Sequence, residues 1–194
     1  MHYIIEYNHD WPKRFVRITG HVKEYLPESC LFHHIGSTSV PGMPGKDIID
    51  LDIEYAAGSL DTVISGLKEA GYEHEGDLGI SGREVFKPAL KSGAASLPAH
   101  HLYACEAGAY ELLKHLAYRD YLIANPDRAE WLATQKIAGD ASAESRDEYI
   151  EKKSCSYAVI TEESMKWADK ALQRPPDVST WNKEKGRKRD ARGP

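Results

Sequence analysis

The sequence is poor in cysteine and has no long apolar run. Its three cysteines, Cys30, Cys105 and Cys155, are scattered, odd in number and without Cys-x-x-Cys spacing. We therefore expect neither a disulfide framework nor a structural zinc site. No segment approaches the roughly 18 to 20 consecutive apolar residues of a membrane-spanning helix, and the N-terminus lacks the apolar core of a signal peptide. A cytoplasmic protein without a membrane partner is the expectation that follows.

Basic side chains are also scarce over most of the chain. The 194 residues contain 25 Lys and Arg against 30 Asp and Glu, a formal net charge of −5. Residues 183–194 carry +4, which leaves −9 for the rest. Nucleic-acid binding needs Lys and Arg clustered over a broad face, and such a face is not expected in the acidic part. Contact with nucleic acid is conceivable only through the basic tail, residues 174–194, whose composition is more typical of a disordered terminus.

Length and composition predict one α+β domain with a hydrophobic core. Hydrophobic residues make up 41% of the chain, as in ordinary globular proteins. Residues 1–107 read as an α/β core, residues 108–173 as a helical C-terminal part of the same domain, and 174–194 as the tail. Periodicity and turn residues predict the individual elements. Strands are expected at 30–35, 48–55, 83–90 and 99–106, and helices at 11–26, between Ser59 and Gly71, and at 109–124, 127–138 and 145–172.

The most informative segment is residues 34–52. Gly36 and Ser37 form a small-residue turn, and in the strand that follows Asp50 and Asp52 alternate with apolar residues. Strand side chains alternate between faces, so both carboxylates point the same way. Neighbouring carboxylates suit Mg²⁺, which prefers one or two of them plus substrate phosphates, and the turn can offer N–H groups to a phosphate. The segment predicts metal-dependent phosphate chemistry, with both aspartates in a hydrated site.

Other polar residues are placed near this site by strand alternation. Arg83 and Lys87 are four residues apart on one expected strand and could clamp phosphate oxygens. Lys46 could reach a phosphate or simply lie in a flexible loop. His101 is expected on the same face as the aspartates, where it could act as a base or a weak metal ligand; a structural histidine bonded to backbone is an equal alternative. His100 then points to the opposite face.

A longer string around the turn resembles a known family. Residues 34–42 read His-Ile-Gly-Ser-Thr-Ser-Val-Pro-Gly and are followed by Lys46 and by Ile-Ile-Asp-Leu-Asp. This wording is similar to that of the GrpB family, and its Gly-Ser turn with Asp-x-Asp to the DNA polymerase beta superfamily of nucleotidyltransferases. Further landmarks of the resemblance extend from Tyr7 to Lys153.

The resemblance implies a polymerase-beta-like nucleotidyltransferase fold, with a small mixed sheet, flanking helices and a helical C-terminal half. It implies Mg²⁺ or Mn²⁺ at Asp50 and Asp52, and phosphates held near Gly36, Ser37 and Thr38. The chain departs from the pattern where Asp47 replaces a usual proline and Tyr103 replaces a common histidine. The third carboxylate of the superfamily has one candidate here, Glu84, expected on the face opposite Arg83.

Three functions remain open at this point. The first is transfer of a nucleotidyl group from a nucleoside triphosphate to a small-molecule or protein acceptor. The second is a nucleotide-binding or regulatory module that keeps the fold without turnover. The third is an interaction protein that works through its helical half and basic tail.

Overall fold

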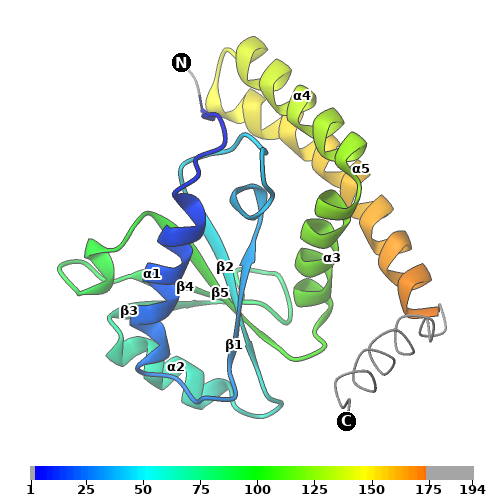
Figure 1. Ribbon diagram of the computed structural model, residues 1–194. Coiled ribbons are helices and arrows are strands. Elements are labelled where there is room, and N and C mark those ends of the chain that lie inside the picture. Colours follow the sequence, from blue (N-terminus) through cyan, green and yellow to red (C-terminus); the bar gives the residue numbers. More distant parts are fainter. Residues whose placement is uncertain (1–2, 174–194) are drawn as a thin grey trace, which may run out of the picture.

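A five-stranded mixed sheet forms the centre of the computed structural model, which describes residues 3–173 (Figure 1). The strands lie in the order β1-β2-β5-β4-β3. Their bounds are β1 Leu31–Ile35, β2 Ile49–Tyr55, β3 Tyr72–Gly76, β4 Glu84–Pro88 and β5 His100–Glu106. The helices are α1 Trp11–Lys23, α2 Leu60–Glu69, α3 Tyr110–Ala124, α4 Pro126–Ser142 and α5 Arg146–Gln173. The predicted α+β class, with a mixed sheet and a helical C-terminal part, is confirmed.

The register of the central strands decides which side chains share a face. β2 runs antiparallel to β1 and parallel to β5, where Asp50 lies beside His101 and Asp52 beside Tyr103. Residues paired across a ladder point to the same side of the sheet. Asp50, Asp52 and His101 therefore lie on one face, as strand alternation predicted.

The opposite face of the sheet is apolar and lies under α1 and α2 (Figure 1). Ile49, Leu51 and Ile53 of β2 are at most 1% exposed and form the middle of this core. Burying a side chain of this size contributes about 1.5–3 kcal/mol. The helix residues packed on them include Ile18, Val22, Val63 and Leu67.

Helices α3, α4 and α5 lie on the aspartate side, where α4 and α5 run beside each other (Figure 1). A second apolar cluster joins them to the loop that follows the Gly-Ser turn. Its buried members are Val40, Met43, Tyr118, Tyr121, Leu122, Leu132 and Ile160. This cluster fixes the helical part against the site.

The boundaries show where local patterns misled the prediction. Strand β3 was not expected, because its sequence Tyr-Glu-His-Glu-Gly has no apolar alternation, yet it pairs with β4 at the edge of the sheet. Helix α1 ends at Lys23, earlier than expected, and α4 continues to Ser142. The basic tail, residues 174–194, lies outside the described residues.

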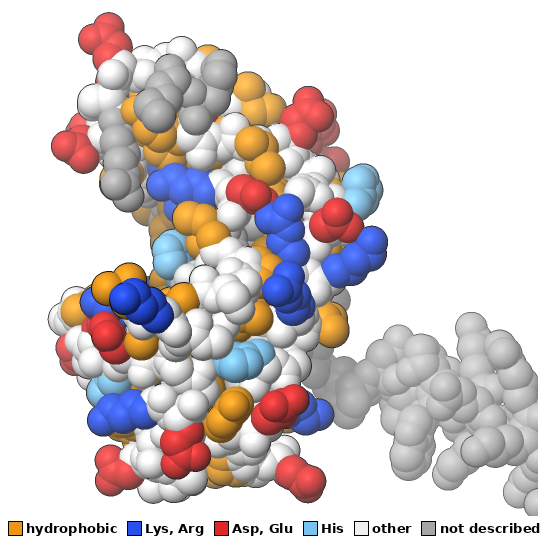
Figure 2. Space-filling model, turned by 90° about the vertical axis from the view of Figure 1, so that its left-hand side faces the viewer, with side chains coloured by type: hydrophobic (Ala, Val, Ile, Leu, Met, Phe, Trp, Pro, Cys, Tyr) orange, Lys and Arg blue, Asp and Glu red, His pale blue; other side chains and the backbone are white. Residues whose placement is uncertain are grey.

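The described part has neither a membrane span nor, on the face drawn, a basic patch. No helix in residues 3–173 combines the length and apolarity needed to cross a bilayer. On the face shown in Figure 2, Lys and Arg side chains are interspersed with Asp and Glu.

Candidate functional site

Asp50 is the accessible carboxylate of the site. Its side chain is 30% exposed, and its Oδ1 accepts a hydrogen bond from His101 Nδ1 at 2.7 Å. The Gly-Ser turn packs closely against the other oxygen of Asp50, Oδ2. Gly36 has a φ of +69°, and a Cβ at this position would lie 2.5 Å from Asp50 Oδ2. Both the backbone conformation and the close approach therefore require glycine at position 36.

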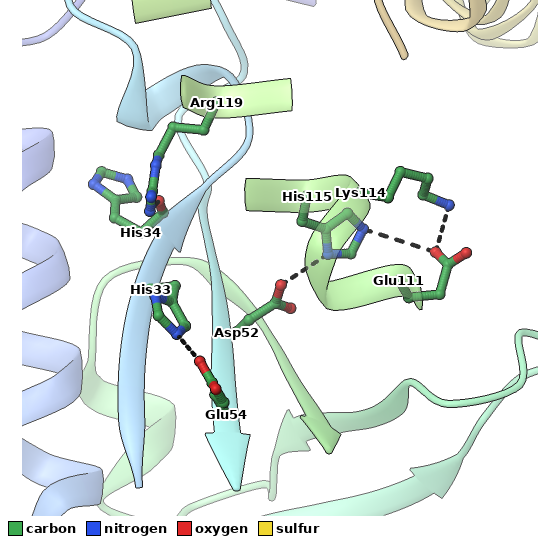
Figure 3. Close-up of polar contacts among 8 residues, drawn as sticks. All are labelled: His33, His34, Asp52, Glu54, Glu111, Lys114, His115 and Arg119. Atoms are coloured by element: carbon green, nitrogen blue, oxygen red, sulfur yellow. Dashed lines mark hydrogen bonds and ion pairs between the residues drawn. The ribbon is translucent and has the colours of Figure 1, made fainter. Parts of the chain in front are cut away.

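Asp52 is fully buried, so the expectation that both aspartates lie in a hydrated site is wrong for this one. Helix α3 packs over this part of β2, and His115 Nδ1 donates a hydrogen bond to Asp52 Oδ2 at 2.8 Å (Figure 3). Asp52 Oδ1 is buried without a hydrogen-bond partner among residues 3–173. A buried carboxylate oxygen with no donor is costly and unusual, and a cation or a further donor would satisfy it.

A cavity of about 230 Å³ lies between the aspartate face and the C-terminal helices. Its polar lining residues include Ser37, Asp50, Arg83, His115, Lys136 and Lys153. Two cationic side chains, Arg83 and Lys153, and the titratable amine of Lys136 thus face one carboxylate, in a chain whose net charge is negative. We call it the phosphate cavity, because this balance of charge favours a ligand with several negative charges.

Lys136 of α4 ties the helical part to the Gly-Ser turn. It is 5% exposed, and its Nζ donates to Ser37 Oγ at 2.7 Å and to the carbonyl of Pro44. Burial, and secondarily the charge of Lys153, lowers the pKa of Lys136 to about 7. An anion in the cavity would favour the charged form of this amine.

Arg83 lines the same cavity and also has a side-chain donor without a partner among the described residues. Its guanidinium lies over the ring of Tyr103, 4.7 Å from the ring centroid, and its Nε is buried without a partner in the described part of the chain. A planar guanidinium suits the oxygens of a phosphate group.

Thr38 and Lys46 lie on the other side of Asp50, in the wall of a second cavity of about 240 Å³ that His101 also lines. Thr38 is buried and bonded to His34 Nε2 at 2.9 Å. Burial lowers the pKa of His34 to about 4, so this histidine is neutral at physiological pH. Lys46 Nζ lies 5.5 Å from the centroid of the Tyr149 ring.

Two other residues considered from the sequence lie apart from the aspartates. Lys87 is exposed on β4, where it forms an ion pair with Glu75, and it lies outside the walls of both cavities. Glu84 pairs with Ala104 across the sheet and binds His74 at 2.6 Å. Its register places it on the face opposite the aspartates.

Comparison with known proteins decides the family. The family model described as GrpB protein matches residues 3–163. The chain belongs to the GrpB family. A crystal structure of conserved protein GrpB from Enterococcus faecalis is 31% identical, covers 85% of this chain and 98% of its own, and has a TM-score of 0.71.

Two further similarities are looser or partial. The UPF0157 protein YqkA of Bacillus subtilis (strain 168) is 34% identical over 167 residues, 84% of this chain and 47% of YqkA. The present GrpB chain thus spans about half the length of that relative. A structure of the Cid1 poly(U) polymerase with MgGTP bound is 12% identical, covers 70% of this chain and 43% of its own, and has a TM-score of 0.48.

The two aspartates of this GrpB protein fit a Mg²⁺ ion that takes only part of its ligands from the protein, and not a metal held entirely by protein side chains. Within residues 3–173 no group of three or more His, Cys, Asp and Glu residues is arranged to hold a metal. Mg²⁺ commonly uses one or two carboxylates and takes its other ligands from water and phosphate. The unpartnered Asp52 Oδ1 and the accessible Asp50 are compatible with that arrangement.

The sequence reasoning did not identify His115 or Lys136 as part of the site. Both lie on helices, 63 positions after Asp52 and 99 after Ser37 respectively. A single histidine or lysine in an amphipathic helix has no local pattern that separates it from a surface residue. Lys153 was noted only as a landmark of the family resemblance.

Proposed function

We propose that this GrpB protein transfers a nucleotidyl group from a nucleoside triphosphate to a hydroxyl, amine or phosphate of a small molecule or protein. The observation that carries the proposal is the phosphate cavity. There, Asp50 and the Gly-Ser turn meet basic side chains from α4, from α5 and from Arg83 just before β4. A triphosphate with a divalent cation has the charges that such walls complement.

Each residue would have a defined task. Gly36 and Ser37 hold phosphate oxygens through the backbone and hydroxyl, while Arg83, Lys136 and Lys153 bind the remaining negative charge. Mg²⁺ or Mn²⁺ held by Asp50 and Asp52 would neutralise charge on the reacting phosphate.

Around the second cavity, the residues would serve the acceptor and the adjoining phosphates. His101, with its Nδ1–H on Asp50, presents the other ring nitrogen as a base for the acceptor proton. Thr38 and Lys46 would contribute further polar contacts there.

A second function is favoured by the state of Asp52. One of its oxygens is occupied by His115, and the residues beside the two aspartates in β5 are His101 and Tyr103, neither of which is a carboxylate. A protein with this site could bind a nucleotide and a cation without turnover. In that case nucleotide affinity would depend on the same residues, and pyrophosphate would not be released.

Calorimetry and pyrophosphate release separate these readings. The wild-type protein is titrated with each of the four common nucleoside triphosphates in Mg²⁺ or Mn²⁺, and then incubated with candidate acceptors. We expect metal-dependent nucleotide binding that Asp50→Asn removes while the Tm is kept.

Glu54→Gln is the matched control, because Glu54 is the next acid on this face of β2 but binds His33 at 2.8 Å. Binding that Asp50→Asn leaves intact would contradict the metal assignment. Binding without pyrophosphate release would favour the module, and no nucleotide binding at all would refute both.

A further inference from the structure

Asp52 and His115 form a buried hydrogen-bonded pair in which one oxygen of the Asp52 carboxylate has no partner among the described residues. The side chains are 0% and 13% exposed, and the bond between Oδ2 and Nδ1 measures 2.8 Å. His115 lies on α3 and lines the phosphate cavity, whereas Asp52 lies on β2 and points toward the His115 ring (Figure 3). One oxygen of the carboxylate is thus satisfied, and Oδ1 is buried and without a partner among the described residues.

The ring of His115 is held from both sides. Its Nε2 lies 4.0 Å from Glu111 Oε2, and Glu111 is in turn paired with Lys114 (Figure 3). The helix itself is anchored by Leu112 and Leu122, each 1% exposed. A carboxylate bonded to a ring fixed in this way has little freedom to rotate.

We propose that His115 is a positioning residue for the cation. By holding Oδ2, it would fix the orientation of the Asp52 carboxylate and keep Oδ1 available to a divalent ion shared with Asp50. This inference rests on the proposed function, because it needs the metal site. Partners that orient a metal ligand commonly change affinity 10- to 100-fold when removed.

The sheet contains a matched pair without a metal role. His33 and Glu54 form the same kind of bond at 2.8 Å between β1 and β2 (Figure 3), and neither residue lines the phosphate cavity. Their side chains are 18% and 23% exposed. If His115 only provides a hydrogen bond to a buried carboxylate, substitution of His115 and substitution of His33 should have the same effect on metal affinity and differ only in their effect on stability.

The test is Mn²⁺ binding to the protein without nucleotide, followed by electron paramagnetic resonance, with urea unfolding in parallel. Three variants are compared with the wild type: His115→Asn, His115→Leu and His33→Leu. Asn places its amide donor where imidazole Nδ1 was, whereas Leu removes the donor at similar bulk. We expect His115→Leu to weaken Mn²⁺ binding about 10- to 100-fold, His115→Asn to restore it to within about threefold, and His33→Leu to leave it unchanged.

Three results would overturn the inference. They are wild-type affinity in a folded His115→Leu protein, a loss in His115→Asn as large as in His115→Leu, and an equal loss in His33→Leu. In these cases the metal site itself still stands. If the wild type binds no Mn²⁺ with or without nucleoside triphosphate, the metal site and the inference are both refuted. Nucleotide binding, measured separately, then shows whether the non-catalytic alternative survives.

Discussion

Two neighbouring residues of β5, His100 and His101, have opposite surroundings and should respond differently to substitution. His101 is half exposed beside Asp50, whereas His100 is buried, with Nε2 bonded to the Tyr72 hydroxyl and Nδ1 to the carbonyl of Pro98. His101→Ala should reduce turnover by about 100-fold or more, the usual contribution of a general base, with little change in nucleotide affinity.

His100→Ala should leave affinity unchanged and lower the free energy of unfolding by about 1–3 kcal/mol, because the Tyr72 hydroxyl loses its buried partner. Steady-state kinetics, calorimetry and urea unfolding of both variants are compared. A turnover defect that follows His100 instead of His101 would contradict the assignment.

Lys136 should make stability depend on pH. Its pKa falls from an ordinary 10.5 to about 7 in the folded protein. Between these values the unfolded chain binds a proton that the folded protein does not, so the free energy of unfolding rises with pH. The penalty of burying the charged amine is complete below about pH 7 and fades toward pH 10.

The measurement compares the wild type with Lys136→Met by urea unfolding between about pH 6 and pH 9. Above pH 7, the wild type should gain stability over the variant by up to about 1.4 kcal/mol per pH unit. A difference that stays constant over this range would show that the amine titrates normally.

Among the secondary-structure elements, α2 is held close to the chain between α1 and β1. Gly66 of α2 is buried, and a Cβ there would overlap the backbone carbonyl oxygen of Tyr25. Gly66→Ala should therefore cost about 1–3 kcal/mol of stability, although alanine is the better helix former.

Gly20 of α1 provides the control for this substitution. A Cβ at Gly20 has nothing within 4 Å. Gly20→Ala should stabilise the protein by about 0.5–1 kcal/mol through helix propensity alone. Thermal unfolding of the two variants is the measurement, and shifts of the same sign would refute this account of α2 packing.

The first turn of α1 contacts Asp47, one of the positions at which the sequence differs from the usual GrpB pattern. Asp47, where the resembled family usually has proline, accepts hydrogen bonds from Trp11 Nε1 at 2.8 Å and from Arg14 at 2.7 Å. Trp11 is fully buried, so its indole N–H needs such an acceptor. The loop that leads into β2 is thereby fixed to the first helix.

At the scale of the whole molecule, the prediction concerns the basic tail, which lies outside the described residues. Deleting residues 178–194 should leave the Tm and nucleotide binding unchanged, because the segment has too little apolar surface to offset the entropy of ordering. A fall in Tm of several degrees would show that the segment contributes to stability. Binding to an acidic protein or a nucleic acid that disappears with the deletion would favour the interaction function.

Much of the fold followed from local patterns. The strand at 48–55 and the start of the helix at 145 were predicted within a few residues, because alternation and turn chemistry act over short distances. The Glu148 N–H does bind Ser145 Oγ, at 3.2 Å. Strand β3 escaped prediction because Tyr72 is its only buried apolar side chain, and its pairing with β4 is a contact that the local pattern does not carry.

The sequence by itself determined that Asp50 and Asp52 share a face and that a glycine turn precedes them, whereas the pairing of β2 with β5 brought His101 to the same face. The pleat of a strand and the conformational freedom of glycine are local properties that every such segment carries. Tertiary structure alone decided that Asp52 is buried against His115 and that Lys136 reaches Ser37. These contacts join residues 63 and 99 positions apart. They depend on how three helices pack over the sheet, and that packing is set by the whole apolar cluster rather than by the residues in contact.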